Sequence, residues 1–340
     1  MRNRQRTFDH NMRITLVGDV MLGRLVNEFL KERPAVYPWG DTLPVLKNST
    51  DLRFCNLECV ISDKGKPWSA TPKEFHFRSD AKNIQVLLAG GIDVISVANN
   101  HSLDYGYEAA VDMLKIFDGA SIKHSGLGKS LDEAERLVKL NTPETRVGFV
   151  AFTDNEPEWE ATKDRFGVLF VPTELGTNRS DNFLDLIRRY RSSVDYLIVS
   201  AHWGSNWGYE PPPEHILFAH ALVEAGADTV FGHSPHVFRG IEIYRNRPIF
   251  YSAGNFIDDY AIDPVERNDE SSLFVLEVKD SAVREIEIYP AKIKDFQVNL
   301  ARGPELQLIG NKMQRLCRKF GTKMSFKKSK DCYVVAINNQ

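Results

Sequence analysis

The chain has 340 residues, of which 42% are hydrophobic, 26% charged and 11% aromatic, a composition that is typical of a globular protein and excludes a disordered one. The formal net charge of −3 provides no general basic field, which argues against a nucleic-acid-binding protein and against attraction to an anionic membrane. No apolar run approaches the ~20 residues that span a bilayer, and the charged start at 1–13 lacks the apolar core of a secretory signal. We therefore expect a cytoplasmic protein without a membrane span, and the oligomeric state is left open.

The four cysteines are too few for a disulfide scaffold in a chain of this length. They are Cys55, Cys59, Cys317 and Cys332, and no two of them form a CxxC pair. We expect four reduced and mostly buried thiols.

Buried strands alternate with helices in the first half of the chain. The apolar patterns predict strands at 12–19, 52–58 and 92–97, helices at 22–31, 83–89 and 109–117, and a short extended segment at 74–78. This alternation is typical of an open α/β sheet, in which ligands bind at the carboxyl ends of the strands.

The second half continues this alternation of strands and helices and then changes to a series of predicted antiparallel strands. We expect a helix at 130–139 capped by Ser130, strands at 146–152, 196–201 and 229–231, a polar loop at 156–178, and helices at 181–191 and from 211–213 to 225. From residue 237 onward, the segments 237–244, 248–251, 273–278 and 285–289 alternate like antiparallel strands, with a hairpin turn at 245–247. One helix after residue 305 and a strand at 332–337 complete the chain. We expect one compact α/β domain at 12–300, with the C-terminal extension 301–340 packed on it.

The stretch 92–106 contains the clearest candidate for a functional site in the predicted sheet. A buried run of β-branched residues stops abruptly at Asn99, Asn100 and His101, where the strand leaves the sheet. Asp104 follows, and a helical pattern begins at once. Two interpretations are open for this stretch alone: a group of functional side chains at a strand end, or a polar turn with Asp104 as the N-cap of the next helix.

Four other predicted strands also end in side chains that bind metal ions or transfer protons. The full set is Asp19; Asn56 and Glu58; Asn100 and His101; His202; and His233 with His236. Carboxylate, amide and imidazole donors suit a borderline divalent ion such as Mn, Fe or Zn, whereas a closed structural zinc site would use thiolates. Each residue taken singly has an ordinary role as a cap or a turn, but the coincidence at five strand ends predicts a site with one or two metal ions that activate water.

Six motifs occur along the chain in a characteristic order. They are GDVMLGR at 18–24, NLE at 56–58, SVANNHSLDYG at 96–106, AHWG at 201–204, AGADTVFGHSPHV at 225–237 and YSAGNF at 251–256. In this order and spacing they resemble the CapA-like family of poly-γ-glutamate capsule biosynthesis proteins, which have a calcineurin-like metallophosphatase fold. The resemblance implies a four-layer αββα sandwich around a metal centre.

The resemblance also assigns roles to individual residues. It implies metal ligands at Asp19, Glu58, Asn100, His202, His233 and His236, with Glu58 as a bridging carboxylate. It implies that His101 protonates the leaving group and that Asp104 orients it, which agrees with the suitability of a carboxylate-held imidazole for acid–base work near pH 7.

The first motif departs from the family pattern. Metallophosphatases proper carry Asp-x-His there, but this chain has Met21 in the third place. One nitrogen ligand is thereby lost, so we expect one ion to bind more tightly than the other, with the side of Asp19 and His236 the weaker one.

Residues in or near the motifs are candidates for substrate binding. Arg24, Arg78 and Arg239 could clamp a phosphate or carboxylate, although a solvated surface position is an equal alternative for each. Asn56 and Trp203 complete the predicted substrate-binding set, and packing is the more ordinary role for a tryptophan.

The sequence therefore predicts a metal-dependent hydrolase that acts on a phosphoester or on an amide such as a γ-glutamyl linkage. The expected substrate is small and anionic or contains glutamyl groups, and no nucleic-acid partner is expected. The alternative from another class is a non-catalytic accessory protein in poly-γ-glutamate or capsule synthesis, which Met21 favours and the intact His101 disfavours.

Overall fold

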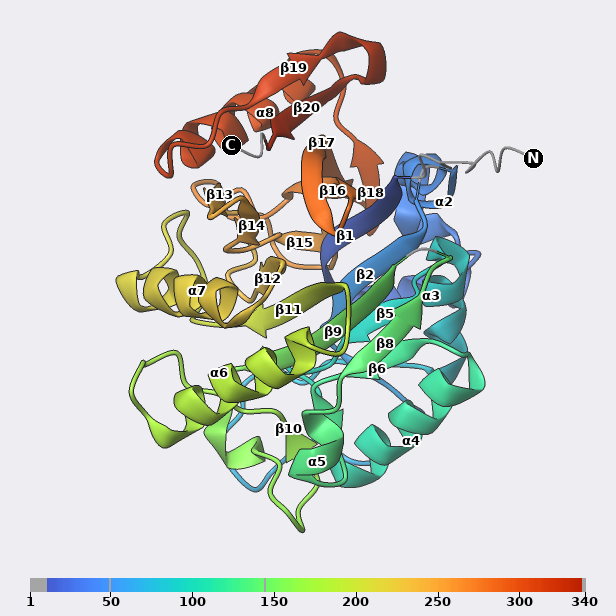
Figure 1. The fold of residues 1–340 in the computed structure, drawn as a ribbon. Coiled ribbons are helices and arrows are strands. Elements are labelled where there is room, and N and C mark those ends of the chain that lie inside the picture. The colour runs from blue at the N-terminus through green and yellow to red at the C-terminus, as the bar shows by residue number, and fades with distance from the viewer. Residues whose placement is uncertain (1–10, 49, 144, 338–340) are drawn as a thin grey trace, which may run out of the picture.

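The computed structural model describes residues 11–48, 50–143 and 145–337. Within these residues two β-sheets pack face to face, and helices cover the outer face of each (Figure 1). Helices α6 (Asn178–Arg191) and α7 (Pro213–Ala225) lie outside one sheet, and α3 (Ile84–Gly90) and α4 (Gly106–Gly119) lie outside the other. The expected α/β class and the four-layer αββα arrangement are confirmed.

The larger sheet has the strand order β19-β20-β17-β16-β1-β2-β5-β6, with β15 beside β1 and β18 beside β17. Strands β1, β2, β5, β6 and β15 run parallel to one another, whereas β16 pairs antiparallel with β1 and the pairs among β16 to β20 are antiparallel. The bounds are β1 (Met12–Val20), β2 (Leu52–Leu57), β5 (Val94–Ser96), β6 (Lys123–Ser125), β15 (Asn255–Ile257), β16 (Glu270–Lys279), β17 (Ala282–Lys294), β18 (Gln297–Leu300), β19 (Ser325–Lys327) and β20 (Cys332–Ala336).

The smaller sheet has the order β13-β14-β12-β11-β9-β8, and its central pairs are parallel. Its strands are β8 (Val138–Asn141), β9 (Arg146–Thr153), β11 (Tyr196–His202), β12 (Thr229–His233), β13 (Ile241–Tyr244) and β14 (Arg247–Phe250). Two short ribbons add β3 (Val60–Ile61) with β4 (Arg78–Ser79), and β7 (Leu127–Gly128) with β10 (Gly167–Val168).

Three of the remaining described helices have four to six residues, and the fourth has 16. They are α1 (Arg24–Phe29), α2 (Leu43–Asn48), α5 (Leu131–Ala134) and α8 (Gly303–Arg318), with 3-10 turns η1 (Tyr37–Thr42), η2 (Ala81–Asn83), η3 (Pro157–Trp159) and η4 (Lys328–Lys330). Throughout the part of the chain that the structure describes, each helix is too short or too polar to traverse a bilayer.

Three buried layers of apolar side chains hold the sandwich together. Between the sheets, Phe54 of β2 packs against Phe149 of β9 with ring centroids 5.3 Å apart. Met113 of α4 fills the layer outside the larger sheet, and Phe183 and Phe218 of α6 and α7 fill the layer outside the smaller one. Complete burial of one such side chain contributes ~1.5–3 kcal/mol, so packing on both faces fixes the parallel strands and the positions of their ends.

The helix predicted at 130–139 is wrong beyond its first turn. The Ser130 side chain accepts a hydrogen bond from the Glu133 amide, as expected for an N-cap, but α5 ends at Ala134. The chain then continues as β8, in which half-buried Val138 and Leu140 alternate with exposed residues. That alternation has the period of an edge strand, not of a helix.

The segment after β12 also differs in detail from the prediction. The hairpin turn is confirmed, because β13 and β14 pair antiparallel around Arg245 and Asn246, whose φ angles are 48° and 61°. However, β14 also pairs parallel with β12, and residues 237–240 lie outside β13. The polar loop at 156–178 contains η3 and β10.

The described part of the C-terminal extension packs on the same structure. Strand β20 pairs with β17, and Leu306, Ile309 and Met313 of α8 contribute to the core between the sheets. The domain boundary at residue 300 stays a prediction. All four cysteines are buried and free of disulfides.

Candidate metal centre

The carboxyl ends of strands from both sheets meet at one place. In the larger sheet, Asp19 lies opposite Asn56 in the register of β1 and β2, and Asn56 lies opposite Ser96 of β5. In the smaller sheet, His202 of β11 lies opposite His233 of β12. The parallel direction of these strands brings together side chains that are far apart in the sequence.

The predicted metal ligands form one connected cluster. Asp19 Oδ1 is 3.3 Å from His233 Nδ1, and Asp19 Oδ2 is 3.7 Å from His236 Nδ1. Glu58 joins the two sides, with Oε2 at 3.8 Å from His236 Nδ1 and Oε1 at 4.0 Å from His202 Nε2. Asn100 Oδ1 lies 3.0 Å from the same His202 nitrogen.

The cluster has the properties of a site that holds a cation. Asp19 Oδ2, both Glu58 oxygens and both His233 nitrogens are buried and have no hydrogen-bond partner among the described residues. Atoms of Asp19, Glu58 and His236 lie within 4.8 Å of one another. Leaving several buried polar atoms unpaired costs ~1–3 kcal/mol each or more, and a divalent ion among them would remove that cost. Oxygen and imidazole donors at these spacings fit a borderline divalent ion.

The charge states agree with ligand roles. Burial raises the pKa of Asp19, but the close imidazoles of His233 and His236 outweigh this effect, so that the pKa falls well below its usual range. Burial and the nearby carboxylates raise the pKa of Glu58, a balance that a bound cation would reverse. Burial lowers the pKa of His202, which keeps the imidazole neutral and able to donate a lone pair.

His101 and Asp104 form a buried pair beside this cluster. His101 Nδ1 is 2.6 Å from Asp104 Oδ2, which also accepts a hydrogen bond from the Phe77 amide at 2.6 Å. The His101 ring stacks on Phe77 with centroids 3.9 Å apart. The N-cap of α4 is Tyr105, so the Asp104 carboxylate serves the histidine and not the helix end.

The environment of the pair favours a neutral imidazole. Burial, followed by the charge of Lys73, lowers the pKa of His101. Burial also raises the pKa of Asp104 to about 7, with Lys73 acting in the opposite direction. Because Nδ1 faces Asp104, Nε2 is the ring nitrogen that can exchange a proton with a bound molecule.

A cavity of about 490 Å³ adjoins the cluster and the pair. Its lining includes Asn100, His101 and His236, so predicted metal ligands and the predicted proton donor face the same space. The rest of the lining is cationic, aromatic or polar: Arg24, Lys73, Glu74, Phe75, Phe77, Glu156, Asn206, Trp207 and Tyr260, with Pro72 and Ala261.

The predicted substrate-binding residues separate into two groups. Arg24 lines the cavity, with its guanidinium 5.2 Å from the Phe77 ring centroid and 2.9 Å from Asp259. The other four predicted residues, Asn56, Arg78, Trp203 and Arg239, are not among the described residues that line this cavity. Arg78 sits over the Tyr105 ring at 4.3 Å, and Arg239 donates from Nε to the Gly208 carbonyl at 2.8 Å.

Asn56 and Trp203 are fully buried. Asn56 donates to Asp19 Oδ1 at 2.9 Å and accepts from Asn99 at 3.0 Å, which orients the carboxylate. Trp203 stacks on His215 with centroids 4.9 Å apart and donates to the Tyr251 carbonyl, a packing role.

The sequence patterns missed Lys73 and Tyr260. Lys73 is 7% exposed, donates to the Asn100 carbonyl at 2.6 Å and lies 3.5 Å from Asp104. Lys73 lies in a loop with no buried strand in front of it, and Tyr260 follows β15, a strand of only three residues, so the strand-end pattern did not find them. Only the run of acidic and aromatic residues after YSAGNF could have indicated Tyr260.

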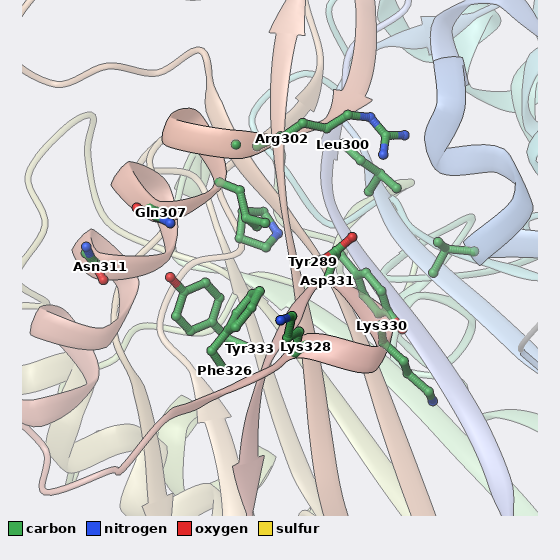
Figure 2. Close-up of a pocket in the computed structure, with 15 residues that line it drawn as sticks. Tyr289, Leu300, Arg302, Gln307, Asn311, Phe326, Lys328, Lys330, Asp331 and Tyr333 are labelled. Atoms are coloured by element: carbon green, nitrogen blue, oxygen red, sulfur yellow. The ribbon is translucent and has the colours of Figure 1, made fainter.

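A larger cavity of about 800 Å³ lies beside the C-terminal segment (Figure 2). In Figure 2 its wall is formed on one side by α8, with Gln307 and Asn311, and on the other by the chain around Lys328 and Tyr333. It shares no lining residue with the metal cluster or with the smaller cavity.

The family model of the bacterial capsule synthesis protein PGA_cap matches residues 13–260. The chain is 33% identical to a probable polyglutamine synthesis accessory protein of Mycobacterium tuberculosis, with 92% of each chain covered. It is 29% identical to the capsule biosynthesis protein CapA of Bacillus anthracis, over 84% of this chain and 69% of that protein. A solved structure of a novel phosphatase from Mycoplasma pneumoniae has the same fold, with a TM-score of 0.51 and 14% identity over 87% of this chain and 95% of the other. The chain therefore belongs to the PGA_cap family of bacterial capsule synthesis proteins.

Proposed function

We propose that this chain is a metal-dependent hydrolase of the CapA type. The observation that carries the proposal is the shared cavity: Asn100 and His236 of the ligand cluster line it together with His101 of the buried His–Asp pair. A site that only stores a cation has no need of an oriented, neutral imidazole facing the same space.

The residues present can hold one or two divalent ions, Mn, Fe or Zn. Asp19, Glu58 and His236 would hold an ion on one side, and Glu58, Asn100 and His202 on the other, with His233 beside Asp19. Such ions supply Lewis acidity, which lowers the pKa of water and neutralises developing negative charge.

The chain's own residues supply the remaining chemistry. Asp104 holds His101 through Nδ1, so the neutral Nε2 takes a proton from the attacking water and passes it to the leaving atom as the bond to the scissile group breaks. Lys73 fixes the backbone carbonyl of Asn100 and thereby the position of the adjacent histidine. Arg24 offers a guanidinium to an anionic group of the substrate.

The substrate class follows from the cavity. Cationic Arg24 beside aromatic Phe77 and Tyr260 favours a small anionic molecule, either a phosphoester or a glutamyl-containing amide. The names of the relatives, which refer to polyglutamine synthesis and capsule biosynthesis, support the glutamyl class. We propose no nucleic-acid substrate, since the net charge of −3 provides no basic surface.

A second candidate is a non-catalytic accessory role in the synthesis of poly-γ-glutamate or a related polymer. It is favoured by Met21 in place of a histidine and by the word accessory in the name of the Mycobacterium tuberculosis relative. In this case the cavity would bind glutamyl groups without cleaving them.

One experiment separates the two candidates. The protein, loaded in turn with Mn²⁺, Fe²⁺ and Zn²⁺, is incubated with p-nitrophenyl phosphate, bis-p-nitrophenyl phosphate and γ-glutamyl-p-nitroanilide. We expect metal-dependent release of the chromophore, and we expect His101→Asn to reduce it most for γ-glutamyl-p-nitroanilide, whose amine leaving group needs a proton. A metal-loaded protein that binds glutamyl peptides but turns over no member of the panel would contradict the hydrolase and favour the accessory role.

A further inference from the structure

The end of β1 lacks a nitrogen ligand, and the Met21 side chain does not replace it. Met21 is fully buried, and its sulfur accepts a hydrogen bond from the Gly23 amide at 3.0 Å. The side of the cluster formed by Asp19 and His236 therefore has no donor from this position, and its protein ligands are reduced to Asp19, Glu58 and His236.

Another strand reaches the same place from a distant part of the sequence. Strand β15 pairs parallel with β1, and Asn255 lies directly opposite Asp19 in that register. The contact is close, since the Asp19 amide donates to the Gly254 carbonyl at 2.9 Å and a Cβ at Gly18 would lie only 1.8 Å from that carbonyl oxygen. Asn255 is also fixed from its other side, because Ser271 donates to its carbonyl.

The Asn255 side chain points at the ligand cluster. It is fully buried, and its Oδ1 lies 3.0 Å from His236 Nδ1, the same nitrogen that is 3.7 Å from Asp19 and 3.8 Å from Glu58. Two donor atoms that bind one ion at ~2.1 Å and at right angles are themselves ~3 Å apart. Asn255 Oδ1 therefore has the spacing of a neighbouring ligand on the ion that His236 would hold.

We propose that Asn255 is the ligand that compensates for Met21, so that this side of the metal centre consists of Asp19, Glu58, Asn255 and His236. The inference rests on the proposed metal centre and does not depend on which bond is hydrolysed. The site keeps four protein ligands but has three oxygens and one nitrogen, where a histidine at position 21 would give two of each.

The change of donor has a consequence for the choice of metal. Oxygen donors suit harder ions such as Mn²⁺, whereas imidazole nitrogen suits Zn²⁺. A site with Asn255 in place of a histidine at position 21 should therefore bind Mn²⁺ better relative to Zn²⁺ than a site with that histidine would.

The test is metal binding by the full chain, measured by calorimetric titration of metal-free protein with Mn²⁺ and by elemental analysis. Asn255→Ala should weaken Mn²⁺ binding at one of two sites by about tenfold or more, the scale seen when a metal site loses a supporting group. The double variant Met21→His/Asn255→Ala should restore that site and bind Zn²⁺ better relative to Mn²⁺ than the wild type does. Asn83→Ala is the matched control, because Asn83 is a buried amide bonded to Asn27 and Ser79, away from the cluster.

The outcomes separate the possible roles of Asn255. Wild-type Mn²⁺ binding in Asn255→Ala would overturn the proposal. A loss that Met21→His does not restore would also overturn it, since Asn255 would then only orient His236. Circular dichroism of the metal-free variants distinguishes a lost ligand from a lost fold. A wild-type chain that binds no ion at all would contradict the metal centre itself, whereas normal binding without hydrolysis would contradict only the hydrolase.

Discussion

The cavity beside the C-terminal segment is larger than the cavity beside the ligand cluster, but of the two only the smaller one adjoins buried polar atoms without partners among the described residues. The larger one, about 800 Å³, has charged side chains on its wall that are already paired: Lys330 with Glu287 at 2.5 Å and Arg302 with Asp41 at 2.7 Å. The smaller one, about 490 Å³, adjoins a buried cluster in which Glu58 has no hydrogen-bond partner among the described residues for either oxygen.

This difference distinguishes charged groups that only stabilise the fold from charged groups that can bind an ion or a substrate. Paired charges near a surface contribute modestly to stability and are complete without a further partner. Buried carboxylates and imidazoles with unused lone pairs are costly unless something occupies the space between them. The comparison therefore predicts that substitutions around the smaller cavity change metal binding and turnover, and that those around the larger cavity change only stability.

The largest effect is expected from His202→Ala. His202 is fully buried between Glu58 and Asn100, so its removal takes away a ligand that no neighbouring side chain replaces. We expect bound metal, measured by elemental analysis, and hydrolysis to be lost together. The control is His220→Ala, which removes a histidine paired with Glu242 outside the cluster. Retention of metal and activity in His202→Ala would place the ion elsewhere.

His101→Asn is expected to lower turnover by about a hundredfold, the scale of general acid–base catalysis. Metal content should stay near that of the wild type, because Asn100 and His202 are unchanged. The loss should shrink for substrates whose leaving group needs no proton, such as p-nitrophenol. Loss of metal in this variant would instead make His101 a ligand, and full activity would show that the His–Asp pair is structural.

A smaller effect is expected from Arg24→Ala. The guanidinium of Arg24 lies 5.2 Å and 5.6 Å from the ring centroids of Phe77 and Tyr260 at the edge of the smaller cavity. Removal of one charged contact to an anionic substrate should raise KM by about tenfold with little change in kcat. Arg33→Ala is a close control, because Arg33 lies 5.2 Å and 5.6 Å from Phe29 and Tyr37 outside the cavity lining. Equal KM values for the two variants would remove Arg24 from the substrate site.

Much of this arrangement could be predicted from local sequence patterns. A buried run followed by a polar residue marks the end of a parallel strand, and this pattern located Asp19, Asn100, His202 and His233. The helix at 130–139 failed because a single turn with an N-cap looks like the start of a longer helix. Only pairing with β9 decides that residues 138–141 form a strand.

The parts of the site that could not be predicted depend on pairing between distant segments. Asn255 reaches Asp19 because β15 lies beside β1, and a strand of three residues carries no periodic signal of its own. Lys73 comes from a loop and reaches Asp104 through the tertiary fold alone. For Trp203 the sequence left a binding role and a packing role open, and the structure shows the packing role, with the side chain fully buried.

The smallest effect on function is expected from Glu287→Gln, beside the larger cavity. Glu287 is 1% exposed at its side chain and accepts hydrogen bonds from Arg13 at 2.7 Å and Tyr289 at 2.9 Å. Burial raises its pKa, but the bonds from Lys330 and Arg13 outweigh it and lower the pKa from 4.5 to about 2. The folded state thus favours the carboxylate, and this stabilisation is complete above pH 4.5 and disappears as the pH falls towards 2. The lowered pKa corresponds to at most about 3 kcal/mol of folded-state stability.

We expect Glu287→Gln to reduce the free energy of unfolding in urea at pH 7 by about 1–2 kcal/mol, because its partners are partly exposed to water. The difference from the wild type should shrink at pH 3, while metal binding and turnover stay unchanged. Glu285→Gln, which removes a more exposed carboxylate paired with Lys327, should change stability less. A fall in turnover without a fall in stability would give the larger cavity a functional role and reverse the comparison between the two.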